Sequence, residues 1–207
     1  LGEADGAVVL LEPDTGRILA MVSKPDFDPN DIDTVWEEAN SEGSTSSVLL
    51  NRATQGLYPP GSTFKVLTTL SFMRQNRKYS KYTYDCSQSQ AVFNGVTVHC
   101  YDNKTHGEQD LSEALANSCN QAFADIGTQL NVNKWRDTLE SFLFNQSLPY
   151  TDASATSRFV LDGKSDKGYI PQTAFGQGDT LITPLHNAMI VSTIANGGLM
   201  MKPYMID

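Results

Sequence analysis

The chain has 207 residues, 40% of them hydrophobic, so it can bury one sizeable core and is not a disordered segment. Twenty-four acidic against fifteen basic side chains give a net charge of −9, which argues against nucleic acid as a partner. No stretch approaches the roughly 18–20 apolar residues that cross a membrane, and no signal-peptide pattern opens the chain.

Two apolar, β-favouring runs open the chain, at residues 7–12 and 17–23, and Pro13-Asp14-Thr15-Gly16 joins them. A turn signal between two such runs predicts a β-hairpin. Their near-continuous apolarity predicts a sheet that helices cover. The polar stretch at 24–47 predicts an irregular connection with one helical turn near 35–39.

Apolar periodicity and capping residues predict the helices that follow. They span residues 62–75, 111–117, 120–130 and 133–144. Residues 149–168 predict a loop. A last helix is expected after Thr183 as N-cap and Pro184 at its first position, ending at Gly197-Gly198. Its predicted buried stripe is formed by Leu185, Ala188, Met189, Ser192 and Ala195. The sequence contains no internal repeat, which predicts a single domain.

Ser62-Thr63-Phe64-Lys65 places a hydroxyl at the start of a predicted helix and an amine one turn further on. Residues three apart share a helix face, so Lys65 can reach the oxygen of Ser62 and act as its base. The helix N-terminus favours negative charge developing there. Taken alone, the pattern also fits a serine N-cap followed by a surface lysine.

Ser118-Cys119-Asn120 lies between two predicted helices, at a corner where residues two apart can face one cleft. A hydroxyl there can relay a proton, and an amide can hold a lysine or an acyl-amide substrate. For Ser118 and Asn120 the alternative is a capping turn. With Ser62 and Lys65 they form the predicted catalytic set.

These two motifs, in this order, are two of the three marks of β-lactamases and penicillin-binding proteins. The chain resembles the transpeptidase domain of class B penicillin-binding proteins over nearly its whole length. Besides residues 51–65 and the opening hairpin, the resemblance covers His106-Gly107, residues 111–120, Gly176-Gln177-Gly178, Thr183-Pro184-Leu185 and Asn196-Gly197-Gly198.

The resemblance implies an α/β (α+β) fold of the penicillin-binding-protein and serine β-lactamase type, an antiparallel sheet flanked by helices. It implies a peptidoglycan D,D-transpeptidase that forms an acyl-enzyme on Ser62 with the D-Ala-D-Ala end of a stem peptide. Lys65 would accept the proton of Ser62, Ser118 would pass a proton to the leaving amine, and Asn120 would position Lys65 and the acyl amide. β-Lactams would acylate Ser62, and no cofactor or metal is implied.

The third mark, Lys-Thr-Gly or Lys-Ser-Gly, does not occur in the sequence, which stops at Asp207. In the family it lies on a later strand that completes the sheet and binds the substrate carboxylate. Residues 1–207 are therefore expected to be one transpeptidase domain truncated at its C-terminal end, with an incomplete active site. The missing strands would come from the same chain or from a second one. The resemblance also implies a membrane-anchored parent, working outside the bacterial cell membrane in elongation or division.

Other acyl-enzyme proteins are the nearest alternatives. Class D β-lactamases, and the β-lactam sensors that resemble them, carry an apolar residue where Asn120 stands. Class A enzymes need a Glu-x-x-Leu-Asn element that is absent here, with Glu140 the nearest candidate. The missing motif also permits an inactive scaffold, although the four predicted catalytic residues are intact.

The sequence does not decide the chemical state of its three cysteines. Cys86 and Cys100 flank a turn at Asn94-Gly95 and could form a disulfide in an extracytoplasmic protein, or remain small buried residues. A zinc site of Cys86, His99, Cys100 and His106 matches no strong spacing template and is not expected. Cys119 is predicted to point into the core.

Overall fold

The computed structural model describes residue 2 and residues 4–205. The chain forms two compact units. The first comprises the described parts of Leu1–Tyr58, Gln146–Ser157 and Ile182–Asp207, and the second comprises Pro59–Asn145 and Arg158–Leu181. No helix in the described part of the chain is long and apolar enough to span a bilayer.

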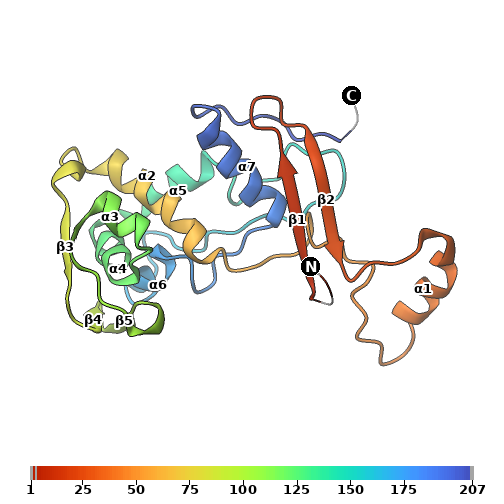
Figure 1. Ribbon diagram of the computed structural model, residues 1–207, viewed down its shortest axis with the longest axis horizontal. Coiled ribbons are helices and arrows are strands. Elements are labelled where there is room, and N and C mark those ends of the chain that lie inside the picture. Colours follow the sequence, from red (N-terminus) through yellow and green to blue (C-terminus); the bar gives the residue numbers. More distant parts are fainter. Residues whose placement is uncertain (1, 3, 206–207) are drawn as a thin grey trace. The chain divides into compact units, whose positions relative to one another are not determined.

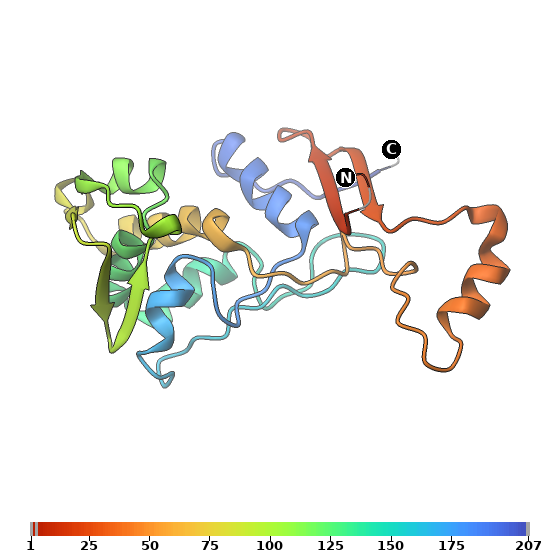
Figure 2. The same ribbon diagram turned by 60° about the horizontal axis from the view of Figure 1, so that its bottom comes forward.

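The first unit is built on the predicted hairpin. Strands β1 (Gly6–Leu11) and β2 (Ile18–Lys24) pair antiparallel, with Val8 opposite Val22. Helix α7 (Pro184–Ala195) packs along β1, as Figures 1 and 2 both show. Several apolar side chains of this hairpin remain exposed to solvent: Val8, Leu10, Leu19 and Val22. This antiparallel hairpin with a covering helix agrees with the predicted antiparallel sheet flanked by helices.

Helix α7 begins as predicted, because the Thr183 side chain accepts a hydrogen bond from the His186 N–H. The buried stripe differs from the predicted one. Ala195 is exposed, whereas His186 and Ile190 are buried beside Leu185. The helix is apolar on more than one side, so periodicity alone did not define the buried face. The rest of this unit includes a 3-10 turn, Pro29–Asp31, and α1, Ile32–Ala39, where one helical turn was predicted.

Helices form most of the second unit. They are α2 (Lys65–Gln75), α3 (Leu111–Ala116), α4 (Asn120–Gln129), α5 (Val132–Glu140) and α6 (Tyr169–Ala174). Helix α4 contacts α2 and α6, and α2 also contacts α5. The predicted helix over 133–144 ends early, because Leu143 and Asn145 adopt positive φ angles of 70° and 60°. Helix α6 was not predicted, and Pro171 inside it obscured its pattern.

Two small antiparallel sheets complete the second unit. Strands β4 (Gln90–Phe93) and β5 (Val96–His99) pair around the predicted Asn94-Gly95 turn. Strands β3 (Thr83–Cys86) and β6 (Gly107–Asp110) pair with each other and were not predicted. In the described residues every named sheet is two-stranded. An isolated two-stranded sheet is marginally stable in water, so these two sheets depend on the elements that they pack against.

An aromatic cluster surrounds the residue before Lys65. The ring centroid of Phe64 lies 6.2 Å from that of Trp135, 6.0 Å from Phe144 and 6.3 Å from Phe159. All four side chains are at most 1% exposed. This cluster fixes the start of α2, and with it the backbone that carries Ser62 and Lys65.

We expect Phe64→Ala to lower the free energy of unfolding by about 3–5 kcal/mol, the usual cost of truncating a buried phenylalanine. Denaturant unfolding of the purified protein measures it. Tyr101→Ala is the matched control, because Tyr101 is 85% exposed, and surface substitutions usually change stability by less than about 0.5 kcal/mol. Equal effects of the two substitutions would contradict the structural role of the cluster.

Candidate active site

Ser62 lies in a short 3-10 turn, Gly61–Phe64, that leads directly into α2. The N-cap of this turn is Pro60, so Ser62 does not have the capping role that the motif alone allowed. Its side chain is exposed and lines a cleft of about 650 Å³. An accessible hydroxyl on a rigid helical turn suits a nucleophile that must reach a substrate.

Gly176 holds this turn in place. The Gly61 N–H donates to the Gly176 carbonyl at 2.9 Å. Gly176 has a φ of +81°, and a Cβ atom there would come within 2.0 Å of the Gly61 carbonyl oxygen. Only glycine permits both this backbone conformation and this approach. The residue belongs to the Gly176-Gln177-Gly178 segment that the sequence singled out.

Lys65 is buried beneath Ser62, with 1% of its surface exposed. Its Nζ lies 3.1 Å from Ser62 Oγ, 2.8 Å from Ser118 Oγ and 2.8 Å from Asn120 Oδ1. A fourth acceptor, the Ser118 carbonyl oxygen, lies 2.7 Å away. The predicted helical spacing therefore places the amine under the hydroxyl.

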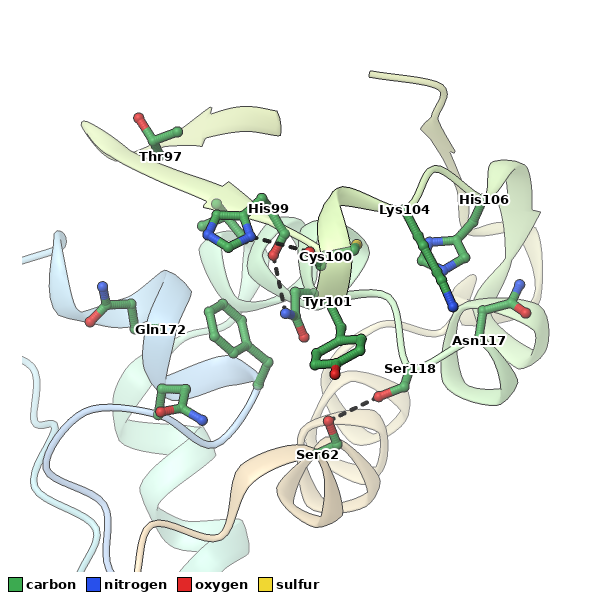
Figure 3. A pocket seen from close by; sticks show the side chains of 14 residues that line it. Ser62, Thr97, His99, Cys100, Tyr101, Lys104, His106, Asn117, Ser118 and Gln172 are labelled. Atoms are coloured by element: carbon green, nitrogen blue, oxygen red, sulfur yellow. Dashed lines mark hydrogen bonds between the residues drawn. The ribbon is translucent and has the colours of Figure 1, made fainter. Parts of the chain in front are cut away.

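Ser118 and Asn120 occupy the corner between α3 and α4. The Ser118 hydroxyl donates to Ser62 Oγ at 2.9 Å, and Figure 3 shows the two side chains facing each other. Ser118 adopts a φ of +52°, which is uncommon for serine and often marks a functional position. The Asn120 amide donates to the His99 carbonyl at 3.1 Å. Cys119, not Asn120, caps α4 through its sulfur.

Burial is the main influence on the charge of Lys65. Desolvation lowers the pKa of the Lys65 amine from 10.5 to about 8, against smaller raising effects of Cys100 and Cys119. The Phe123 ring lies beneath the amine, with its centroid 5.7 Å from Nζ. An amine of this kind is partly neutral near physiological pH and can accept a proton, as a general base must.

The structure brings all four sequence-predicted site residues together: Ser62, Lys65, Ser118 and Asn120. Sequence reasoning missed the other residues that line the cleft, including Tyr101, Lys104, Gln172, Phe175 and Gln177. Of these, only Gln177 lay in a segment that the sequence singled out. The His99 carbonyl that holds Asn120 is a backbone group and leaves no signal in the sequence.

The three cysteines have free thiols in the described part of the chain. Cys86 Sγ and Cys100 Sγ are 3.9 Å apart, so they approach each other as expected without forming the disulfide that was left open. Cys119 is fully buried, as predicted. The four residues considered from the sequence as a zinc site do not all come together. The ring nitrogen Nδ1 of His99 faces the Cys100 carbonyl, and Cys119 takes the place of His99 in the group.

Chemically, the arrangement supplies an accessible hydroxyl, a buried amine with a lowered pKa, and a second hydroxyl bridging the two. These are the parts of a serine nucleophile activated by lysine rather than by histidine. They suit acyl transfer, because the second hydroxyl can carry a proton from the amine toward a leaving group.

Comparison with known proteins gives consistent matches. The family described as "penicillin binding protein transpeptidase domain" matches residues 6–207. Peptidoglycan D,D-transpeptidase PbpA of Mycolicibacterium smegmatis is 33% identical over 220 residues, covering 100% of this chain and 44% of the relative. Stage V sporulation protein D of Bacillus subtilis is 31% identical, over 97% of this chain and 30% of the relative.

Solved structures agree. Penicillin-binding protein A from Mycobacterium tuberculosis, as an imipenem acyl-enzyme complex, superposes with a TM-score of 0.84 at 32% identity, over 97% of this chain and 48% of that one. The D,D-transpeptidase domain of a peptidoglycan glycosyltransferase from Eggerthella lenta gives a TM-score of 0.88 at 29% identity, over 99% and 52%. The chain thus spans less than half of the curated relatives and about half of these two solved chains.

Proposed function

We propose, from the premise that this chain belongs to the penicillin-binding protein transpeptidase domain family, that it carries the nucleophile side of a peptidoglycan D,D-transpeptidase. The single observation that carries the proposal is the set of contacts around Lys65 Nζ, which joins Ser62, Ser118 and Asn120. The names of the relatives support the reaction class.

In the first step, Ser62 Oγ attacks the carbonyl carbon of the penultimate D-alanine, and its proton passes to Lys65 Nζ. The C–N bond to the terminal D-alanine then breaks. The Ser118 hydroxyl gives its proton to the leaving amine and regains one from Lys65. In the second step, an amine of a neighbouring stem peptide loses its proton along the same route. It then displaces Ser62, which recovers its hydroxyl.

The acceptors around Lys65 favour this direction of proton transfer. The Ser118 carbonyl and Asn120 Oδ1 can only accept hydrogen bonds. A neutral amine has two N–H groups for these two acceptors, and its lone pair remains available to the Ser62 hydroxyl. Asn120 acts as a positioning residue for Lys65, held in place by its own bond to the His99 carbonyl. Its amide also lines the cleft, where it can contact an acyl amide.

The substrate is a stem peptide ending in D-Ala-D-Ala, and β-lactams acylate Ser62 as its mimics. One relative, penicillin-binding protein A from Mycobacterium tuberculosis, has been captured as its imipenem, ceftriaxone and penicillin G acyl-enzymes, which supports β-lactams as ligands. A chain of a peptidoglycan synthase complex matches this chain at 29% identity, which supports protein partners for the parent. The place of action is the extracytoplasmic face of the bacterial cell membrane, where peptidoglycan is cross-linked.

The same proposal treats residues 1–207 as part of one transpeptidase domain that further strands complete. Exposed apolar side chains on β1 and β2, such as Leu10 and Leu19, support it, because additional strands or helices would cover them. A Lys-Thr-Gly strand would then supply the carboxylate contact and a second oxyanion donor.

The experiment that tests this function uses the complete protein and excess penicillin. We expect one equivalent of covalent adduct to form, followed by negligible turnover, because no deacylating glutamate is recognisable. Intact-mass spectrometry measures the adduct, and absorbance of the β-lactam measures turnover. A second assay measures the release of D-alanine from a stem peptide. Release that requires an acceptor amine, or that is faster when one is added, completes the assignment. Sustained hydrolysis of many penicillin equivalents would show a β-lactamase instead.

A further inference from the structure

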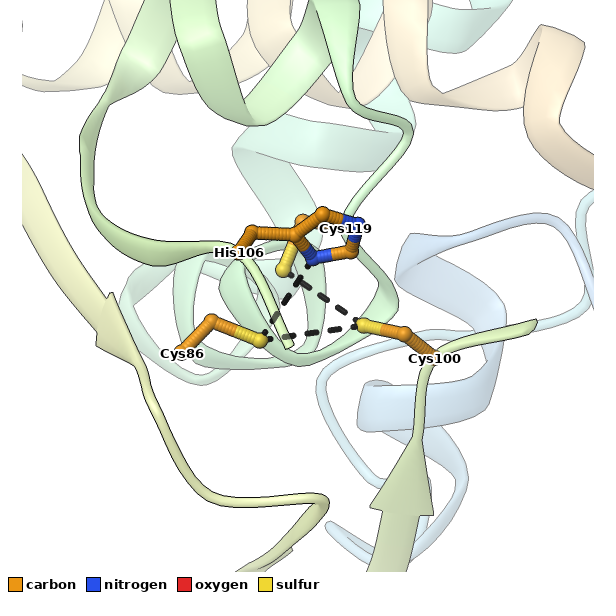
Figure 4. A group of neighbouring side chains, drawn as sticks. All are labelled: Cys86, Cys100, His106 and Cys119. Carbon is orange, nitrogen blue, oxygen red and sulfur yellow. Dashed lines mark hydrogen bonds between the residues drawn. The ribbon is translucent and has the colours of Figure 1, made fainter. Parts of the chain in front are cut away.

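Three cysteines and one histidine meet at a single point beside the candidate active site. The ligand atoms of Cys86, Cys100, His106 and Cys119 all lie within 4.8 Å of one another. Figure 4 shows the three thiols and the imidazole converging from separate backbone segments. The acyl-transfer steps use none of these side chains.

The distances within the group fit a tetrahedral metal site. Zinc bonds of about 2.3 Å to sulfur and about 2.0–2.1 Å to nitrogen place ligand atoms about 3.8 Å apart for two sulfurs and about 3.6 Å for sulfur and nitrogen. Cys86 Sγ and Cys100 Sγ are 3.9 Å apart, and Cys100 Sγ and Cys119 Sγ are 3.6 Å apart. His106 Nδ1 lies 3.6 Å from Cys86 Sγ. Each of these three separations is close to an edge of that tetrahedron.

The same sulfur–sulfur distances favour a metal site over a disulfide. A disulfide brings two sulfurs to about 2.05 Å, and it would leave the third thiol and the imidazole unexplained. Here Cys100 is about equally close to Cys86 and to Cys119. Four ligands around one centre account for this even spacing, whereas a bonded pair does not.

Charge and burial also suit a cation. The three thiols are at most 1% exposed, so an added metal would be shielded from water. Three cysteines, which bind zinc as thiolates, and one imidazole form a ligand set that structural zinc sites use. Cys100 and His106 line the cleft, which gives a metal ion a route of entry.

We propose that Cys86, Cys100, His106 and Cys119 bind one zinc ion as a structural Cys₃His site. The ligands stand at the end of β3, just after β5, just before β6 and at the N-cap of α4. The zinc therefore ties both two-stranded sheets to the start of α4. This supplies the stability that such small sheets lack alone.

The zinc also positions the active-site corner. Cys119 lies between Ser118 and Asn120, and Cys100 follows His99, whose carbonyl accepts the Asn120 amide. The donor Asn120 and the acceptor His99 of that hydrogen bond are thus each the chain neighbour of a zinc ligand. Loss of the metal is expected to loosen the contact between Asn120 and Lys65. The four ligands are positioning residues and take no part in the proton transfers.

The test begins with metal analysis of the complete protein, purified without chelators. We expect one equivalent of zinc, lost in His106→Ala and retained in the matched control His99→Ala. His99 is the neighbouring histidine, and its side chain lies outside the ligand set. The thermal unfolding midpoint of His106→Ala should be lower than that of the unmodified protein, together with its zinc content. Adding zinc to the buffer should not restore this midpoint. Equal zinc content in both variants would overturn the assignment.

A second measurement remains valid where His106→Ala fails to fold. The unmodified protein is denatured with chelator and without reductant, and its thiols are alkylated and counted by mass. We expect all three cysteines to be alkylated, and cobalt in place of zinc to give the visible absorption of a tetrahedral thiolate site. A disulfide, or three free thiols in a protein that binds neither metal, would refute the zinc site. Because the readouts are metal content and thiols, they are independent of transpeptidase activity.

Discussion

Replacing Ser62 with alanine is expected to abolish covalent labelling of the complete protein by a fluorescent penicillin. In the proposed reaction the acyl bond forms on Ser62 Oγ, and alanine has no atom there that can carry it. The hydroxyl is exposed in the cleft, so its removal should leave the fold intact. The substitution removes only the hydrogen bonds of this hydroxyl with Lys65 and Ser118. Gel fluorescence measures the label, and peptide mass spectrometry of the unmodified protein locates it.

Thr63→Ala is the matched control for this experiment. Thr63 is also an exposed hydroxyl residue of the same turn, but its Oγ1 donates to the Pro60 carbonyl at 2.7 Å. We expect this variant to remain labelled. Label that persists in Ser62→Ala, or that maps to a peptide without Ser62, would disprove the assignment of the nucleophile.

Replacing Lys65 with arginine is expected to slow acylation by about 10²-fold or more, the usual contribution of a general base. Arginine keeps the positive charge but remains protonated at all working pH values, so it cannot accept the Ser62 proton. The second-order rate of penicillin acylation, measured by stopped-flow or quenched labelling, gives the effect. Near-normal acylation by the arginine variant would mean that only charge is required.

The pH profile tests the same role in the unmodified protein. The amine is protonated below its pKa of about 8 and neutral above it. In the proposed mechanism the neutral amine is the base, so the acylation rate should rise with pH, approaching tenfold per unit well below pH 8, and level off above it. Lys104→Arg makes the same exchange at an exposed lysine of the same cleft and should preserve this profile. A rate that falls through this range would show that the protonated amine is required.

Short-range patterns in the sequence predicted much of the fold. The turn at Pro13–Gly16, the Asn94-Gly95 turn and the Thr183 N-cap each depend on residues a few positions apart, and each is confirmed. Strands β3 and β6 were missed, because they are short and pair across residues far apart in sequence. Local periodicity contains no information about such a pairing.

The sequence by itself determined the chemistry of the candidate site. The order of Ser62, Lys65, Ser118 and Asn120, together with the matching segments around them, identified the family without any coordinates. The tertiary structure decided which atoms meet: that Lys65 is buried enough to lower its pKa, and that the His99 carbonyl holds Asn120. It also decided that Cys119, rather than His99, joins Cys86, Cys100 and His106. The physical reason is that residue types and short spacings follow from the chain alone, whereas burial and distances between remote segments exist only once the chain has packed.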